Sequence, residues 1–148
     1  MAAESVVLDT DTLSELSRGN TAVRNRAFGY LRDFGRLTIT SITVFERLRG
    51  YRLAIRDRKP FERQLHAFEE LVANCIVLPF DQASAVVAAE IWAASSRSQR
   101  QKLGDILIAA IALSRQMALV TRNRRDFEGF SKVSGTTLRL EDWTRPKR

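Results

Sequence analysis

The sequence predicts an α/β domain in which a central, mostly parallel sheet of four or five strands carries helices on both faces. Short runs of β-branched and apolar residues, such as 5–8 and 37–40, alternate with longer segments whose apolar residues recur at helical spacing. This alternation is typical of parallel sheets, because their strands are joined by crossover helices. A chain of 148 residues suits one core, so we expect a single domain over 1–143 and a basic tail over 144–148.

Two helices are expected between the first two strand candidates. Thr12 and Glu15 are spaced as a capping box, which predicts a helix over 12–18, and Gly19 follows its end. Over 21–34, apolar side chains recur three and four residues apart, as on the buried face of a helix. The chain is then expected to enter the sheet again.

Two further helices are expected after the second strand. Ser41 is a suitable N-cap for the first, which continues into an arginine-rich stretch. Pro60 suits the first turn of the second, where apolar residues from Phe61 to Val72 form one face. His66 is the only histidine and lies within this second helix, so we interpret it as structural.

The second half of the chain continues the alternation. In chain order we expect a strand at 75–80, a helix capped by Asp81 and reaching about residue 95, a polar basic connection at 97–102, a helix at 105–116, and strands at 118–121 and 137–140. The helix at 105–116 is apolar nearly all round, which indicates that it is buried.

The composition favours a polyanionic partner inside a reducing compartment. Net charge is +7, the pI is about 10.5, and the cations are mostly arginine, whose guanidinium group matches phosphate geometry. A solvated surface or an acidic protein partner would explain the charge equally well. Cys75 is the only cysteine and lies in an apolar run, so we expect a buried thiol rather than a nucleophile. We find no signal peptide and no run long enough for a membrane helix, and we expect a cytoplasmic protein.

Four acidic residues follow apolar runs or lie near helix starts. These are Asp9, Glu46, Asp105 and Asp126. In open parallel sheets, ligands bind beyond the carboxyl ends of the strands, so all four side chains are expected to meet in one cleft.

Each acid also has a purely local explanation. Asp9 or Asp11 could cap the first helix, Glu46 could close a capping box with Thr43, Asp105 could favour the positive end of a helix dipole, and Asp126 could start a turn. These explanations require four independent roles on the same side of one sheet. A shared site requires a single cause.

The residues that are missing narrow the chemistry of such a site. The sequence has no second histidine for paired acid–base catalysis, no cysteine–histidine zinc spacing and no glycine-rich phosphate loop. Ligands that are all carboxylate oxygens favour Mg²⁺ or Mn²⁺. Such a metal can activate water and orient a phosphate.

Basic residues flank three of the four acids. They are Arg47, Arg49, Arg52, Arg56, Arg58, Lys59 and Arg63 after Glu46, Arg97, Arg100 and Lys102 before Asp105, and Arg122, Arg124 and Arg125 before Asp126. A carboxylate centre surrounded by arginines suits a phosphate backbone, so Arg47, Arg49, Arg122, Arg124 and Arg125 are candidate nucleic-acid-binding residues. Alternatively, about half of these cations pair with neighbouring acids, and each such surface pair contributes only about 0–1 kcal/mol.

At this point the chain resembles a known family, the PIN domain of VapC-type toxins. The resemblance runs from about residue 5 to 143 and rests on motifs in the family's order. They are Val7-Leu8-Asp9-Thr10-Asp11, the stretch Ser41 to Glu46 with Gly50, Asp105 to Ala110, Val120-Thr121-Arg122-Asn123 with Asp126-Phe127, and Leu140 to Trp143.

The resemblance implies a PIN-like three-layer fold and a Mg²⁺- or Mn²⁺-dependent ribonuclease, the toxin half of a type II toxin–antitoxin pair. It implies that Asp9, Glu46, Asp105 and Asp126 are the catalytic and metal-binding residues, with Thr10, Asp11, Thr121 and Asn123 in support. Asp11 stands where the family usually has asparagine, so its role is open. The family also implies a homodimer, a larger toxin–antitoxin assembly, and a VapB-type antitoxin whose tail occludes the cleft.

Two other functions fit parts of the sequence. The segment Asp9 to Leu13 approaches the first motif of haloacid-dehalogenase-type phosphatases, in which Asp9 would be a nucleophile. However, Leu13 and Ala109 depart from the two motifs of that family. A basic RNA-binding protein without catalysis is the other alternative, although unneutralised carboxylates would weaken its binding to phosphate.

Overall fold

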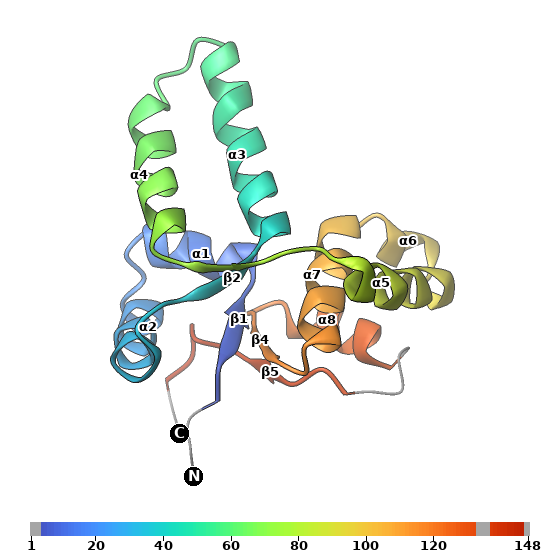
Figure 1. The fold of residues 1–148 in the computed structure, drawn as a ribbon. Coiled ribbons are helices and arrows are strands. Elements are labelled where there is room, and N and C mark those ends of the chain that lie inside the picture. The colour runs from blue at the N-terminus through green and yellow to red at the C-terminus, as the bar shows by residue number, and fades with distance from the viewer. Residues whose placement is uncertain (1–3, 133–136, 147–148) are drawn as a thin grey trace.

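The computed structural model describes residues 4–132 and 137–146 (Figure 1). Strands and helices alternate along most of the chain, as the sequence predicts. The elements are β1 (Val6–Leu8), α1 (Thr10–Ser17), α2 (Thr21–Phe34), β2 (Thr38–Thr40), α3 (Ser41–Arg56), α4 (Glu62–Ala73), β3 (Ile76–Leu78), α5 (Gln82–Ala94), α6 (Arg97–Arg100), α7 (Leu103–Ser114), β4 (Ala118–Val120), α8 (Arg124–Ser131) and β5 (Leu140–Glu141).

All strand pairings in the described residues are parallel, which confirms the predicted sheet type. Strands β1, β4 and β5 form one hydrogen-bonded ladder in the order β1-β4-β5, and β2 pairs with β3 in a second ladder. Strand β2 also lies against β1, so the two ladders together give the spatial order β3-β2-β1-β4-β5. The carboxyl ends of β1, β2 and β4 therefore lie at the same edge.

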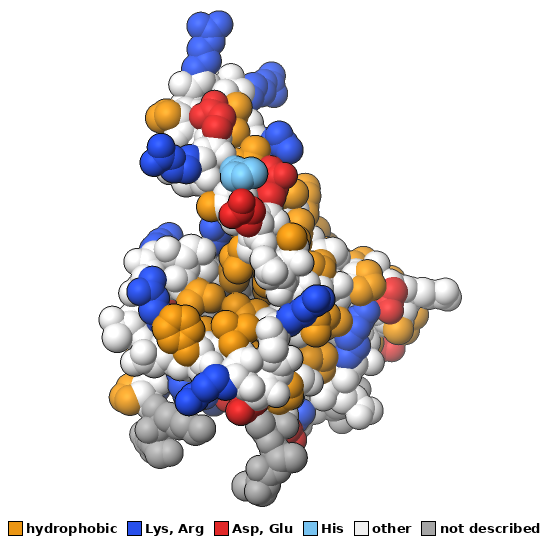
Figure 2. All heavy atoms as spheres, turned by 60° about the vertical axis from the view of Figure 1, so that its left-hand side comes forward, with side chains coloured by type: hydrophobic (Ala, Val, Ile, Leu, Met, Phe, Trp, Pro, Cys, Tyr) orange, Lys and Arg blue, Asp and Glu red, His pale blue; other side chains and the backbone are white. Residues whose placement is uncertain are grey.

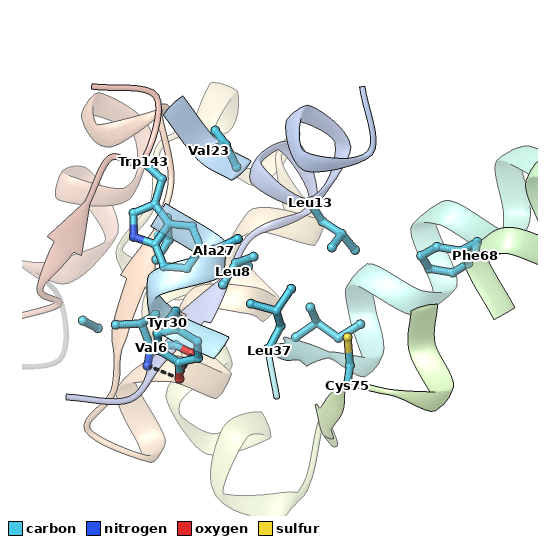
Figure 3. Close-up of a cluster of buried hydrophobic side chains, with 13 residues drawn as sticks. Val6, Leu8, Leu13, Val23, Ala27, Tyr30, Leu37, Phe68, Cys75 and Trp143 are labelled. Carbon is cyan, nitrogen blue, oxygen red and sulfur yellow. Dashed lines mark hydrogen bonds between the residues drawn. The ribbon is translucent and has the colours of Figure 1, made fainter. Parts of the chain in front are cut away.

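Residues of one strand alternate between two cores, one on each face of the sheet. Val6 and Leu8 of β1 pack with Leu13 and Val23 of α1 and α2 (Figure 3). Val7 points the other way, into a second core built largely from α5, α7 and α8. This is the period-two pattern expected of a strand buried on both sides, and it confirms helices on both faces.

The first helix begins two residues before the predicted start. Asp9 is its N-cap, and the Asp9 carboxylate accepts a hydrogen bond from the backbone N–H of Thr12. The predicted Thr12–Glu15 capping box is therefore wrong, because Thr12 already lies inside the helix. The Thr12 hydroxyl instead donates to the carbonyl of Val120, 3.1 Å away, which ties α1 to β4.

Helices α3 and α4 also begin differently from the prediction. Thr40, rather than Ser41, caps α3, and its hydroxyl oxygen accepts from the N–H of Thr43. Thr43 lies within the helix, so the alternative capping box between Thr43 and Glu46 is not formed. Pro60 precedes α4 instead of lying in its first turn, since that helix begins at Glu62.

Three smaller features add to or correct the predicted elements. The basic connection at 97–102 contains the short helix α6, closed by a capping box between Ser96 and Gln99. His66 is exposed on α4, where it faces Glu70, and does not pack in the core. The fifth strand covers Leu140–Glu141 rather than 137–140.

Helices α3 and α4 project together from the body of the domain (Figure 1). Lys and Arg side chains gather around the far end of this pair (Figure 2), where the exposed residues Arg56, Arg58, Lys59 and Arg63 lie. Among the described residues, no helix has the length and apolar character needed to cross a bilayer. Cys75 is buried as predicted, and burial raises the pKa of its thiol.

Candidate functional site

The four predicted acids lie on four different elements whose relevant ends converge. Asp9 directly follows β1, and Glu46 is in the second turn of α3. Asp105 and Asp126 lie in the first turns of α7 and α8. Each element starts or ends at the carboxyl edge of the sheet, so the arrangement agrees with the edge that the sequence predicts.

The pKa of Asp105 shows that the acids influence one another. That pKa is raised from 3.8 to about 6, first by burial and then by the negative charges of Asp9, Glu46, Asp11 and Asp126, in that order. A carboxylate is repelled in this way only by charges close to it. The tertiary structure therefore places Asp9, Glu46, Asp11 and Asp126 where their charges all act on Asp105.

Asp9 is the most deeply placed of these acids, with 3% of its surface exposed. Its Oδ1 atom lies 2.7 Å from the Thr12 N–H that it caps. Burial raises the Asp9 pKa, while hydrogen bonds from Thr121 and Thr12 act in the opposite direction. Capping a helix and contributing to a shared acidic site are thus both properties of the same side chain.

Glu46 is positioned by a hydrogen bond from Thr10, and it can lie against α7 because Gly104 has no side chain. The Thr10 hydroxyl donates to Glu46 Oε1 at 2.8 Å and lies 3.0 Å from the Thr43 hydroxyl. A Cβ atom built on Gly104 would stand only 2.6 Å from Glu46 Oε2. Gly104 therefore lets the Glu46 carboxylate reach the neighbourhood of Asp105, a role that the sequence analysis missed.

We expect Gly104→Ala to reduce the activity of the site by roughly tenfold with little change in stability, since a misplaced catalytic group carries a penalty of that order or more. The new methyl group must push Glu46 away, and a flexible side chain moves at low energetic cost. Gly50→Ala is the matched control, because nothing lies within 4 Å of a Cβ there. Equal activity of the two variants would contradict the positioning role of Gly104.

The predicted supporting residues also come together. Asn123 Nδ2 donates to Asp11 Oδ2 at 2.6 Å, joining residues 112 positions apart. The Asn123 backbone N–H donates to Thr121 Oγ1 at 2.9 Å, and Thr121 is fully buried. Asp11 is thus an exposed, hydrogen-bonded member of the acidic group, and its local alternative as the cap of α1 is excluded by Asp9.

Asp126 is paired with a lysine that the sequence analysis placed only among the flanking cations. Lys102 Nζ lies 2.8 Å from Asp126 Oδ2. Lys102 occupies the N-cap position of α7, three residues before Asp105. The sequence places this lysine close to Asp105, but its proximity to Asp126 depends on how α8 packs against α7.

The two candidate RNA-binding arginines on α3 differ in their surroundings. Arg47 donates to the Ser14 hydroxyl at 2.8 Å and to the Tyr51 hydroxyl, and its guanidinium lies over the rings of Tyr51 and Phe68. These contacts hold Arg47 between helices. Arg49 is exposed, and its guanidinium stacks 5.3 Å from the centre of the Phe45 ring.

The three candidate arginines before Asp126 lie at the surface. Arg122 is 3.4 Å from Glu15, and Arg124 is 4.0 Å from Glu128, both at partly exposed positions. Arg125 lines a small pocket beside Asp126. Such exposed pairs are weak, so these guanidinium groups can exchange a protein carboxylate for a phosphate.

A pocket of about 360 Å³ opens beside the acids. Glu46, Gly104 and Asp105 form one wall, Phe45 and Leu103 contribute apolar surface, and Arg49 and Lys102 contribute positive charge. Its size and mixed lining are suitable for part of a polyanionic chain placed against the carboxylates.

The carboxylate oxygens of the site are suitable ligands for a hard dication, although the side chains do not form a complete set of metal ligands. Among residues 4–132 and 137–146, no three His, Cys, Asp or Glu side chains form a metal-binding arrangement. Asp126 is turned onto Lys102 and Asp11 onto Asn123. A bound Mg²⁺ or Mn²⁺ would relieve the repulsion that raises the pKa of Asp105, and oxygen ligands suit both ions.

Comparison with known proteins gives one consistent result. A family model described as the PIN domain matches residues 6–135. A tRNA(fMet)-specific endonuclease VapC of Shigella flexneri is 38% identical over 112 residues, which cover 74% of this chain and 77% of the relative. The protein of the same name from Salmonella typhimurium is 34% identical over 110 residues, covering 73% and 76%.

Solved structures are similar over nearly the whole chain. The DNA-bound VapBC complex of Salmonella typhimurium superimposes with a TM-score of 0.70 at 28% identity, covering 95% of this chain and 99% of that one. VapBC-1 of nontypeable Haemophilus influenzae gives a TM-score of 0.70 at 23% identity, covering 95% and 98%, and so shares the fold.

Proposed function

Because this chain belongs to the PIN domain family and is related to VapC endonucleases, we propose that it is a metal-dependent ribonuclease toxin. One structural observation carries the proposal. Four carboxylates from separate parts of the chain lie where their charges act on Asp105, and after burial these charges raise its pKa. Repulsion of this kind costs stability, and groups with strongly perturbed pKa values are concentrated at functional sites.

The proposed reaction is hydrolysis of an RNA phosphodiester at this edge of the sheet. Asp9, Asp105, Asp126 and Glu46 would hold Mg²⁺ or Mn²⁺, which would supply Lewis-acid stabilisation and lower the pKa of a bound water. Thr10 orients Glu46 through its hydroxyl, and the Thr121–Asn123 turn keeps Asp11 beside the cleft.

The basic residues around the cleft would bind the RNA backbone. Arg49, Arg122, Arg124 and Arg125 are the partly or fully exposed candidates, while Arg47 contributes through the helix contacts that it already makes. Since two relatives are named for cleavage of tRNA(fMet), initiator tRNA is the first substrate to test.

A cleavage assay with Asp9→Asn tests the proposal. Asparagine caps helices as well as aspartate does, so the variant is expected to keep α1 and lose only the charge. We expect wild-type protein to cut RNA in Mn²⁺ and the variant to be inactive. If neither protein cuts any of a broad set of RNAs while wild type still binds RNA, the non-catalytic RNA-binding alternative replaces the nuclease.

The phosphatase alternative loses its basis, because the family match assigns Asp9 to a PIN domain. In addition, Asp11 is engaged by Asn123 at the position where a phosphatase would need a free acid. Release of phosphate from phosphomonoesters in the same assay would restore this alternative.

We also propose that the protein is cytoplasmic, forms a homodimer and is neutralised by a VapB-type antitoxin. Similar solved structures are VapBC complexes. Leu53 on α3 and Trp92 on α5 are exposed apolar side chains, and each is a candidate for contact with a second copy. A groove of about 300 Å³ between α3 and α4, lined by Val44, Leu48 and Phe68, suits an apolar antitoxin segment.

The neighbouring reading frame provides the test of the antitoxin. A small adjacent gene product is expected to copurify with this chain and to suppress its RNA cleavage when the two are coexpressed. Sedimentation of the chain alone checks the homodimer, and a monomer at micromolar concentration would contradict it.

A further inference from the structure

Of the five acids in the site, Asp126 alone is in an ion pair within the described part of the chain. Its partner is Lys102, with Nζ 2.8 Å from Oδ2. The side chains of Lys102 and Asp126 are 48% and 33% exposed, so the pair is accessible to solvent and easily opened. The pair thus orients the Asp126 carboxylate but can open at low energetic cost.

Lys102 also stands between two hollows of the surface. It lines the pocket of about 360 Å³ together with Glu46 and Asp105, and a smaller pocket of about 140 Å³ together with Arg125 and Asp126. Its ammonium group is carried on a flexible stem. The Lys102 ammonium group can therefore reach either the Asp126 carboxylate or the larger pocket.

We propose that Lys102 is a built-in counter-ion for Asp126, that a divalent metal competes with it for this carboxylate, and that the released lysine then binds a phosphate of the RNA. The second half of the proposal rests on the proposed ribonuclease function. Lys102 would neutralise part of the acidic group while no metal is bound. Once metal is bound, the Lys102 ammonium group would pair with a phosphate of the substrate instead of with the Asp126 carboxylate.

Competition follows from the geometry of the pair. An ammonium group 2.8 Å from Asp126 Oδ2 and a metal ion on the same carboxylate repel each other. Metal binding through Asp126 therefore favours the departure of Lys102 from this pair. The larger of the two pockets that Lys102 lines contains Glu46, Asp105 and Arg49, where a phosphate beside the metal would need positive charge.

The decisive experiment measures Mn²⁺ binding by calorimetry in the absence of RNA. Lys102→Met is expected to bind Mn²⁺ about three- to tenfold more tightly than wild type, because a competing charge a few ångströms away is removed. Lys102→Arg keeps the charge and is expected to bind Mn²⁺ as wild type does. Lys59→Met, at the far end of the α3–α4 pair, controls for the loss of one unit of net charge.

A second measurement separates Lys102 from a merely structural residue. With saturating Mn²⁺, Lys102→Met is expected to show a KM for RNA about tenfold above wild type, and Lys59→Met a smaller change, as expected for the loss of one phosphate contact. A structural defect would instead weaken metal binding and lower the melting temperature.

The outcomes distinguish this proposal from the ribonuclease proposal. Unchanged or weaker Mn²⁺ binding by a folded Lys102→Met overturns the counter-ion role, and an unchanged KM overturns the phosphate role. If Lys102→Met does not fold, Lys102→Gln is measured in its place with the same expectations. If wild type cuts no RNA, the ribonuclease function fails, while the Mn²⁺ comparison still decides the counter-ion role.

Discussion

Asp105→Asn is expected to abolish RNA cleavage and to make the metal-free protein more stable at neutral pH. Loss of activity follows because Asp105 lies at the centre of the acidic group, where four other carboxylates act on it. Increased stability follows because a neutral amide does not experience their repulsion. Most substitutions destabilise a protein, so a gain in stability would indicate that repulsion between the carboxylates has been relieved.

This gain in stability depends on pH because the Asp105 carboxyl has different pKa values in the folded and unfolded protein. The Asp105 pKa is raised from 3.8 to about 6 in the folded state, so folded protein holds the proton more tightly than unfolded protein does. The stability contributed by that proton is fully present below pH 3.8 and is lost as the pH rises through 6. After a discount for solvent screening, the loss at pH 7 is on the order of 1 kcal/mol.

Urea denaturation of the metal-free proteins at pH 4 and pH 7 measures this effect. The two proteins should differ less at pH 4 than at pH 7, where Asp105→Asn should be the more stable. Asp33→Asn, an exposed substitution on α2, is the matched control and should behave as wild type at both pH values. Retained cleavage by Asp105→Asn, or equal stability of the two proteins at pH 7, would remove Asp105 from the centre of the site.

Excess EDTA is expected to stop RNA cleavage completely, and Mg²⁺ or Mn²⁺ added afterwards is expected to restore it. The physical reason is that the donor atoms of the site are carboxylate oxygens whose mutual repulsion a dication relieves. Without the cation, the acids repel one another and no Lewis acid lowers the pKa of a bound water. Full activity in EDTA would exclude the metal mechanism.

Thermal melting provides a readout of the same metal that does not depend on activity. A ligand at one hundred times its Kd stabilises the folded state by about 2.7 kcal/mol, so Mn²⁺ should raise the melting temperature of wild type and raise it less in Asp105→Asn. The rise should shrink below pH 6, where Asp105 takes up the proton that competes with the metal. An equal rise in both proteins would place the metal elsewhere.

The helix starts show why local and functional explanations of one acid were hard to separate. Asp9 caps α1 and is also a buried member of the acidic group. A parallel strand followed by a helix places the cap residue at the carboxyl edge, which is also where ligands bind. The two roles are therefore compatible at Asp9. The sequence alone presents them as alternatives, and the spacing of Thr12 and Glu15 predicts a different cap from the one that the structure has.

The sequence by itself determined the strand–helix alternation, the buried helix α7 and the edge at which the acids meet. These depend on hydrophobic periodicity and on residues a few positions apart, and such signals are local. It also placed Asp9, Glu46, Asp105 and Asp126 in one site, since strand ends of a parallel sheet share an edge.

Only the tertiary structure decided which side chains touch within that site. The Glu46 carboxylate against Gly104, Asn123 on Asp11 and Lys102 on Asp126 join segments that meet through packing of α3, α7 and α8. Contacts between distant segments depend on how whole elements pack and on which rotamers fit the space left between them. No local pattern in the sequence carries that information, and the proposed role of Lys102 arises entirely from it.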